Sequence, residues 1–197
     1  MKNSSVTLGG LALAAALALS GCAPAGEPTS GGSDSAPAAE DVATSFNDTD
    51  VMFAQMMIPH HSQAIEMSDM ILAKDDISTD VTDLATQIAD AQGPEIDQLT
   101  AWLDEWEAEP LDGMGDMHHP MEGMMSNNQM ARLDAATGAE AERLFLENMI
   151  IHHEGAIDMA ETEVDGGENA DAIALANEMI TSQQAEIDTM QELLTTR

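Results

Sequence analysis

Residues 53–67 read FAQMMIPHHSQAIEM and residues 145–159 read FLENMIIHHEGAIDM, so one motif occurs twice without a gap. The two copies share Phe, Met, Ile, His-His, Ala, Ile and Met at the same positions. A second element, Gln-x-x-Glu-Ile-Asp, follows each copy, at residues 92–97 and 183–188. Self-similarity at a fixed distance is the signature of a duplicated structural unit. The sequence therefore predicts two copies of one helical hairpin.

Apolar residues at helical spacing predict two long helices in each hairpin. The expected ranges are 50–74 with 79–107 in the first copy, and 138–165 with 170–195 in the second. Ala, Leu, Met, Glu and Gln are abundant, whereas β-branched and aromatic residues are scarce, which favours helices over strands. We predict an all-α chain in which two duplicated hairpins form an antiparallel four-helix bundle, joined by a Met-rich crossover connection.

Local signals mark several helix ends. A capping box is expected before the third long helix, and a pair of glycines should stop that helix, at Thr137-x-x-Glu140 and Gly166-Gly167. A second capping box, Ser126-x-x-Gln129, predicts a short helix within the connection. Pro59 and Pro94 are expected to kink their helices rather than end them, because their counterparts in the second copy lie in uninterrupted helical patterns.

The first 45 residues have a different composition from the rest of the chain. Lys2 precedes an apolar run over residues 6–19, too short to span a membrane, and the run ends in Leu19-Ser20-Gly21-Cys22, which resembles a bacterial lipobox. We therefore expect an exported protein, lipid-anchored at Cys22 to the outer face of the cell membrane, or periplasmic. The alternative is an ordinary signal peptide with a stray cysteine. Cys22 is the only cysteine, so no disulfide forms within the chain.

These observations define the domain organisation. We predict a signal peptide over 1–21, a lipidated N-terminus and disordered tether rich in Ala, Pro, Gly and Ser over 22–45, and one duplicated domain over 46–197. Within that domain the first hairpin occupies 46–107, the connection 108–137 and the second hairpin 138–197.

Five basic side chains oppose 37 acidic ones, for a net charge of −32. Nucleic-acid binding is excluded, because phosphate contacts need clusters of Lys and Arg. Most of the acidic excess is expected to form a solvated surface.

Two adjacent histidines fall within the apolar face of the first helix of each hairpin, His60 with His61 and His152 with His153. A Gln-x-x-Glu pair interrupts the apolar stripe of each second helix, Gln92 with Glu95 and Gln183 with Glu186. Counted from the hairpin turns, these histidines and glutamates have the same height in the bundle, which predicts one polar layer. Four imidazoles packed together in a low-dielectric interior cannot all be protonated, and neutral imidazole is the commonest metal ligand. The layer is a candidate metal site or, alternatively, a structural hydrogen-bond layer.

Methionines accompany the histidines. Met57 and Met149 lie one turn before the histidine pairs, and imidazole with thioether favours copper, particularly Cu(I). Glu95 and Glu186 are then expected to hold the outer ring nitrogens. If they bind metal directly, iron, manganese or zinc becomes possible. The connection adds a candidate accessory site for a soft metal, formed by Met114, Met117, His118, His119, Met121, Met124 and Met125.

The twin motif Met-Ile-x-His-His-x-x-Ala-Ile-x-Met, with its Gln-x-x-Glu-Ile-Asp partner and the intervening Gly-Met-Met-Ser-x-x-Gln-Met, resembles the bacterial family called domain of unknown function 305. The resemblance implies a ferritin-like four-helix fold, export and a link to copper binding and copper resistance. It directs attention to four histidines and four methionines: His60, His61, His152, His153, Met57, Met67, Met149 and Met159. It does not predict the lipid anchor or the strong acidity.

The sequence contains no Glu-x-x-His, nucleophile elbow, phosphate-binding Gly-rich loop, Cys-x-x-Cys or His-Glu-x-x-His. We therefore expect a membrane-tethered extracytoplasmic copper-binding protein, acting in sequestration, buffering or transfer rather than as an enzyme. Two alternatives stay open: a dinuclear iron or manganese oxidoreductase using His and Glu, and a metal-free helical interaction module. The sequence identifies no protein partner.

Overall fold

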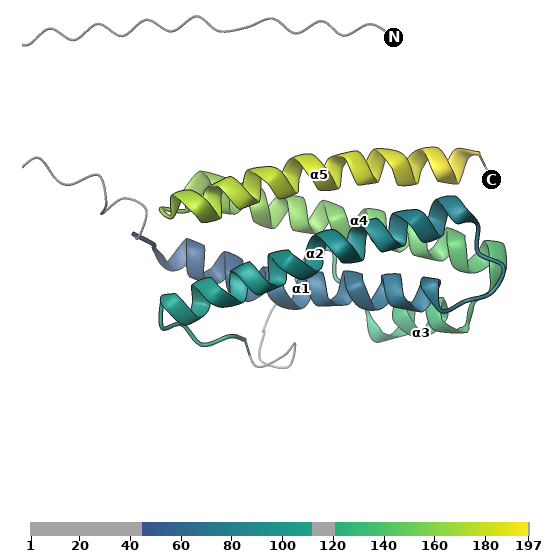
Figure 1. The fold of residues 1–197 in the computed structure, drawn as a ribbon, viewed down its shortest axis with the longest axis horizontal. Coiled ribbons are helices and arrows are strands. Elements are labelled where there is room, and N and C mark those ends of the chain that lie inside the picture. The colour runs from purple at the N-terminus through teal and green to yellow at the C-terminus, as the bar shows by residue number, and fades with distance from the viewer. Residues whose placement is uncertain (1–44, 112–120, 197) are drawn as a thin grey trace, which may run out of the picture. The chain divides into compact units, whose positions relative to one another are not determined.

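The computed structural model describes residues 45–111 and 121–196, and within these ranges all regular structure is helical (Figure 1). The helices are α1 (Asp48–Leu72), α2 (Thr79–Glu105), α3 (Asn127–Ala135), α4 (Gly138–Gly166) and α5 (Ala170–Thr195). The prediction of an all-α chain with four long helices is confirmed, and each predicted boundary lies within two residues of the observed one. The predicted signal peptide, lipidation site and most of the predicted tether lie outside the described residues, as does the stretch 112–120 of the connection.

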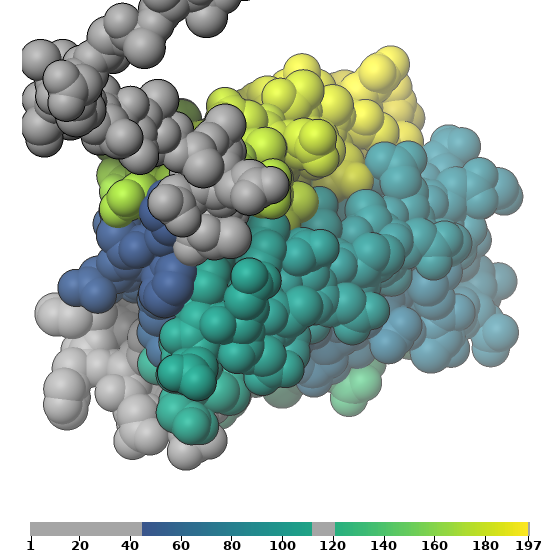
Figure 2. Space-filling model, turned by 60° about the vertical axis from the view of Figure 1, so that its left-hand side comes forward, coloured from purple at the N-terminus to yellow at the C-terminus, as the bar shows by residue number. Residues whose placement is uncertain are grey.

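The long helices form two antiparallel hairpins that meet through their first helices. Helix α1 packs along α2, α4 packs along α5, and the hairpins join mainly through α1 and α4. The Asn47 side-chain amide, at the start of α1, donates to the Gly166 carbonyl at the end of α4 over 2.9 Å, so α1 and α4 run antiparallel. Helices α2 (teal) and α5 (yellow-green) are neighbours on the face shown in Figure 2. The result is an antiparallel four-helix bundle.

In each hairpin, an acidic residue near the start of the first helix accepts hydrogen bonds from the turn of the other hairpin. Asp50 is fully buried and accepts hydrogen bonds from the backbone N–H groups of Glu168 and Asn169, at 3.1 and 2.8 Å. Glu142, which is 92 residues further along and occupies the equivalent position, accepts from the backbone N–H of Ser78. Both carboxylates therefore act as caps for the helix that follows the turn, α5 or α2. These contacts extend the sequence duplication to the tertiary structure.

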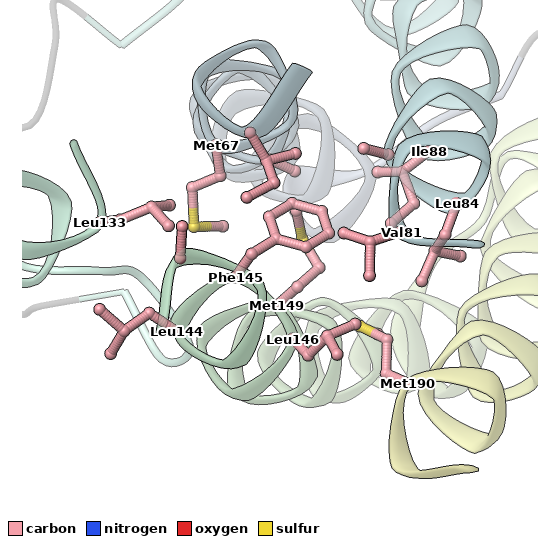
Figure 3. Close-up of a cluster of buried hydrophobic side chains, with 14 of the residues drawn as sticks. Met67, Val81, Leu84, Ile88, Leu133, Leu144, Phe145, Leu146, Met149 and Met190 are labelled. Carbon is pink, nitrogen blue, oxygen red and sulfur yellow. The ribbon is translucent and has the colours of Figure 1, made fainter. Parts of the chain in front are cut away.

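The apolar core has two parts, separated along the helix axes. One cluster takes residues 64–71 of α1 and 141–149 of α4, and Figure 3 shows Phe145 at its centre, between Met67, Leu133 and Ile88. The other takes residues 53–57 of α1 and 156–160 of α4, together with Trp102. Burying each such large side chain contributes about 1.5–3 kcal/mol. The stretch between the two clusters contains both histidine pairs.

Both prolines lie inside continuous helices, Pro59 in α1 and Pro94 in α2. Each lacks the N–H that an interior helical residue donates to the preceding turn, and this leaves one backbone carbonyl without its helical partner. For Pro59 that carbonyl belongs to Gln55, and beside the proline the Ser62 hydroxyl donates to the Ile58 carbonyl over 2.8 Å. The expectation that neither proline ends its helix is confirmed.

The helix ends agree with the sequence signals at two places and differ at one. Ser126 and Gln129 form the expected capping box of α3, and α4 ends at Gly166 with Gly167 as its C-cap. The capping box predicted at Thr137 is wrong, because the Thr137 side chain makes no cap hydrogen bond. Gly138 opens α4 with a φ of 52°, and the Glu140 carboxylate instead accepts two hydrogen bonds from Arg143.

The described part of the connection is held against both α1 and α4. Gln63 of α1 makes two hydrogen bonds to the backbone of Met125, at 2.7 and 2.9 Å. On α4, the glycine at position 155 lets the backbone of Glu122 and Gly123 lie directly on the helix, and Gly123 has a φ of 83°. A Cβ at position 155 would overlap the Glu122 carbonyl group. The connection therefore covers the middle of the α1–α4 pair.

We predict that Gly155→Ala destabilises the protein by about 1–3 kcal/mol, because the added methyl meets rigid backbone rather than a movable side chain. Gly93→Ala is the matched control. Gly93 is also helical, and apart from its chain neighbours nothing lies within 4 Å of its added Cβ; because Pro94 opposes the gain in helix propensity, the change should alter the stability by less than about 1 kcal/mol. Urea unfolding of both variants measures the difference, and equal effects would show that the connection does not lie on α4.

A second buried acid departs from the duplication. Glu163 is fully buried beside Asp50, whereas the equivalent position of the first hairpin is Ile71. Burial, a hydrogen bond to Asp50 and the charge of Asp50 raise the pKa of Glu163 to about 8. Burial also acts to raise the pKa of Asp50, but backbone donors, Asn47 first and then Asn169, outweigh burial and lower it. At neutral pH the pair therefore holds one proton, which is on Glu163, and Asp50 is ionised.

We predict that this protonated Glu163 makes the folded state less stable as the pH rises. The ordinary pKa of Glu163 is 4.5 and the folded value is about 8, so between these values the folded state holds a proton that the unfolded state has lost. The unfolding free energy should therefore fall from about pH 5 to 8 relative to Glu163→Gln. Urea unfolding across this range tests it, with exposed Glu161→Gln as control. Parallel curves for wild type and Glu163→Gln would contradict the shift.

Candidate metal centre

The two histidine pairs meet at the centre of the bundle. His60 is the midpoint of α1 and His152 the midpoint of α4, so antiparallel packing brings the two residues to the same level. Their ring centroids lie 3.8 Å apart, with the ring planes tilted by 39°. Since His60 and His152 are equivalent in the duplication, their contact marks the axis that relates the two hairpins.

All four imidazoles are fully buried between the two apolar clusters. Burial, followed by the nearby His61 and His153, lowers the pKa of His60 to about 3, against a smaller opposing effect of the Glu122 backbone. Burial and then the other three histidines hold the pKa of His152 well below its usual range. The inner pair is therefore neutral at physiological pH, the form of imidazole that binds metal ions.

A carboxylate holds the outer histidine of each pair. The Nε2 atoms of His61 and His153 lie 2.7 Å from a carboxylate oxygen of Glu95 and Glu186, respectively. The two acids thus meet the histidines in one layer, as their equal heights along the hairpins predict. When Nε2–H of a neutral imidazole donates to the carboxylate, the lone pair of its Nδ1 atom points away from the acid. This arrangement orients the outer pair with Nδ1 as the free electron donor.

The layer contains many buried polar atoms that lack a hydrogen-bond partner among the described residues. Six are imidazole nitrogens: both ring nitrogens of His60 and of His152, and Nδ1 of His61 and of His153. The Oε1 atoms of Gln92 and Gln183 are two more. Buried polar groups in folded proteins are almost always paired, so a group of unpaired ones indicates a ligand, ion or water. The group fits a metal ion, because each neutral imidazole offers a lone pair on one ring nitrogen and each glutamine Oε1 offers its own.

The structure separates the four methionines that sequence and resemblance grouped with the histidines. Met57 and Met149 are fully buried and lie one turn from the histidines of their helices. Met67 belongs to the apolar cluster around Phe145, and Met159 packs at the edge of the other cluster. Both lie seven residues from the inner histidine of their own helix, about 10 Å along the axis. One ion therefore cannot contact Met67 or Met159 together with the histidine layer in this arrangement.

The histidine layer is not a closed cage of hard ligands. In residues 45–111 and 121–196, no three His, Cys, Asp or Glu side chains are arranged to hold one metal ion. Glu95 and Glu186 are engaged by the outer histidines, which leaves imidazole and thioether as the donors at the centre. This donor set is soft and neutral, which favours Cu(I) over magnesium, calcium or manganese.

Only part of the accessory site in the connection is described. Met121 and Met125 are buried and Met124 is half-buried. The Met125 thioether accepts a hydrogen bond from the Gln129 amide over 3.2 Å and packs in the cluster around Phe145. Met125 therefore serves the core in this structure. The other residues of the predicted accessory site, Met114, Met117, His118 and His119, lie outside the described residues.

Sequence reasoning missed three residues that shape the centre. Gln63 and Gly155 occupy equivalent positions in the two motifs, and they fix the connection over the histidines in different ways. Glu122 supplies the backbone beside His60. The sequence does show that the two motifs differ at this position, with Gln in one and Gly in the other. It does not show why they differ, because that depends on the path of the connection.

Comparison with known proteins places these features in a family. The family model described as "Domain of unknown function (DUF305)" matches residues 50–194. A solved DUF305 protein from Streptomyces coelicolor is 32% identical, with a TM-score of 0.68, over 75% of this chain and 91% of that one. A DUF305 fragment from Deinococcus radiodurans is 31% identical, with a TM-score of 0.70, over 77% and 98% of the two chains. No curated protein matches the sequence.

A third solved relative, CopM, is described with bound metal. Its Cu(I)-bound form is 29% identical to this chain, with a TM-score of 0.65, over 76% of this chain and 98% of CopM. CopM has also been solved with Cu(II), with silver and without metal. The family match covers most of the sequence and the whole described bundle except the first two residues of α1 and the last residue of α5. This chain therefore belongs to the DUF305 family.

Proposed function

We propose that the protein is an exported, lipid-anchored copper-binding protein that takes up Cu(I) as cargo at the histidine layer between α1 and α4. Its role is to sequester, buffer or pass on copper rather than to catalyse a reaction. His60 and His152 are the inner ligands, His61 and His153 contribute through Nδ1, and Met57 and Met149 are the neighbouring thioethers. Glu95 and Glu186 orient the outer histidines, with Gln92 and Gln183 beside them.

One observation carries the proposal: six imidazole nitrogens without partners lie together in the fully buried centre of the bundle. Such a group destabilises a folded protein unless something binds it, because each unpaired buried polar atom loses its hydrogen bonds with water. A bound monovalent soft cation gives these atoms a partner and adds only one positive charge to the interior. Such a cation prefers neutral ligands. The copper-bound and silver-bound structures of CopM support the same ion class for a relative of this chain.

The proposed location rests on the N-terminal sequence. The apolar run and Leu19-Ser20-Gly21-Cys22 fit export and lipidation, and the Streptomyces coelicolor relative is described as a candidate secreted protein. Among the described residues, no helix has the length and apolar character needed to cross a membrane. In an oxidising compartment, histidine and methionine bind copper without entering the disulfide chemistry that captures cysteine.

The dinuclear iron or manganese alternative needs carboxylates as direct ligands. Glu95 and Glu186 are its candidates, and each is hydrogen-bonded to an outer histidine. Glu186 is further fixed by the Gln87 amide at 3.2 Å, from α2 to α5. This favours an orienting role for both acids over direct coordination.

Metal retention tests the proposed ligands. After anaerobic incubation with Cu(I), Fe(II), Zn(II) or Mn(II) and desalting, the purified protein should retain copper most tightly, as measured by elemental analysis. Replacing His60, His61, His152 and His153 by Leu should remove the tightest copper. The double variant His118→Leu/His119→Leu, in the connection, is the control and should keep it. Equal copper in the four-histidine variant, or preferential retention of iron or manganese, would refute the proposal.

Stability separates a metal site from a structural hydrogen-bond layer. Without metal, His60→Leu/His152→Leu should melt at the same temperature as wild type or higher, because unpaired imidazoles are replaced by apolar side chains. Copper should then raise the melting temperature less than in the wild type, whose histidine layer alone contributes about 2.7 kcal/mol when free copper is 100 times its Kd. A structural layer predicts the reverse: a lower melting temperature without metal and the same copper effect in both proteins.

A further inference from the structure

A second group of methionines surrounds a cavity near the start of α1. The cavity has a volume of about 160 Å³ and is lined by Met52 and Met56 of α1, Met159 of α4, and four other side chains, Thr49, Phe53, Thr162 and Glu163. Met52 and Met56 are one helical turn apart, and Met159 faces them from the antiparallel helix. Three thioethers from two helices therefore line one cavity.

The cavity is open to solvent, unlike the histidine layer. The Met52 side chain is 55% exposed, while Met56 and Met159 are half-buried. The inner histidines, by contrast, are fully buried beneath the connection and between the apolar clusters. An ion arriving from solvent therefore reaches the thioethers of the cavity without any opening of the bundle.

Core packing does not explain Met52 and Met56, which belong to neither apolar cluster, whereas Met159 packs at the edge of one. The positions of the second hairpin that correspond to Met52 and Met56 are Leu144 and Asn148, both buried. The residue that corresponds to Met159 is Met67, which is fully buried in the core. The duplicated fold thus forms without methionine at the first two positions, and it is Met52 and Met56 of α1 that join Met159 of α4 around this cavity.

We propose that Met52, Met56 and Met159 form a second, solvent-accessible site for a monovalent soft cation, Cu(I) or Ag(I). Thioethers are soft neutral ligands, and three of them select Cu(I) or Ag(I) over Zn(II), Cu(II) and Ca(II). Binding forms three metal–sulfur contacts in exchange for solvent ligands, with no change of oxidation state and no proton transfer. The site is separate from the histidine layer and exists independently of it.

Its position also gives it a role in the proposed function. Met52, Met56 and His60 follow one another at intervals of four residues along one side of α1, each step rising about 6 Å. On α4, Met159 and His152 lie seven residues apart, on the same face. The thioether site is thus the outer end of a line of soft ligands that leads to the inner histidines. Resting on the proposed function, we assign it the capture of the ion before transfer to His60 and His152.

The site itself is tested without the histidine layer. In the variant with His60, His61, His152 and His153 replaced by Leu, selectively ¹³C-methyl-labelled methionines are titrated with Ag(I) under anaerobic conditions and followed by NMR. The methyl signals of Met52, Met56 and Met159, assigned by single Met→Leu changes, should shift together in one binding step. Zn(II) should leave them unmoved. Unshifted signals during Ag(I) binding elsewhere, or equal shifts with Zn(II), would overturn the proposal.

Should the four-histidine variant fail to fold, the same titration of the wild-type protein gives the answer, because the three signals must still move as one group. The triple variant Met52→Leu/Met56→Leu/Met159→Leu should lose this binding step, since Met→Leu keeps the volume of the side chain. Met179→Leu/Met190→Leu, in the core of α5, is the matched control and should retain it.

A separate measurement, the rate at which the histidine layer binds Ag(I), tests the capture role. In a wild-type histidine background, the triple methionine variant should fill the histidine layer more slowly with Ag(I) but reach the same final affinity, followed through the histidine ring signals. An unchanged rate together with loss of the thioether step would overturn capture and leave the site standing. Loss of the final affinity would place the three methionines in the central site instead.

Discussion

The contact between His60 and His152 is the constraint on which the bundle depends. The two residues are equivalent in a duplicated sequence and lie at the midpoints of antiparallel helices, so their meeting fixes how the hairpins are related. Each imidazole must stay neutral, because burial beside three others disfavours a positive charge. The apolar clusters on either side stabilise the helices strongly enough to keep this polar layer buried. The buried polar layer at the centre therefore lowers the stability of the bundle.

Other contacts repeat around the same axis. Asp50 and Glu142 each cap the turn of the opposite hairpin, and Glu95 and Glu186 each hold an outer histidine. Such paired contacts arise because two copies of one hairpin, packed antiparallel, place equivalent residues in equivalent surroundings. They hold the ends and the middle of the bundle independently of the connection between the hairpins.

At several positions the two copies carry different residues, and these differences make the two hairpins unlike each other. Gln63 and Gly155 hold the connection against α1 and α4 in different ways, by hydrogen bonds on one side and by close backbone approach on the other. Glu163 places a second carboxyl group beside Asp50, where the first hairpin has Ile71. The thioether-lined cavity of Met52, Met56 and Met159 lies next to this acid pair. The paired contacts of the two hairpins thus form the bundle, and residues that differ between the two copies line the cavity near the start of α1.

The sequence by itself determined the helices, the duplication and the height of the polar layer, because helical periodicity and repeat spacing are local properties. Even Pro59 and Pro94 were predictable as interior residues, since the second copy showed uninterrupted helix at the same positions. Only the tertiary structure decided which polar atoms lack partners, how Gln63 and Gly155 place the connection, and that Met67 and Met159 lie away from the histidines. It also showed that the Thr137 side chain does not cap α4 and that the Glu140 carboxylate accepts from Arg143. For the unpaired atoms, the connection and the two methionines the physical reason is the same: the groups that surround them lie far apart in the sequence, and only packing decides which of these groups meet.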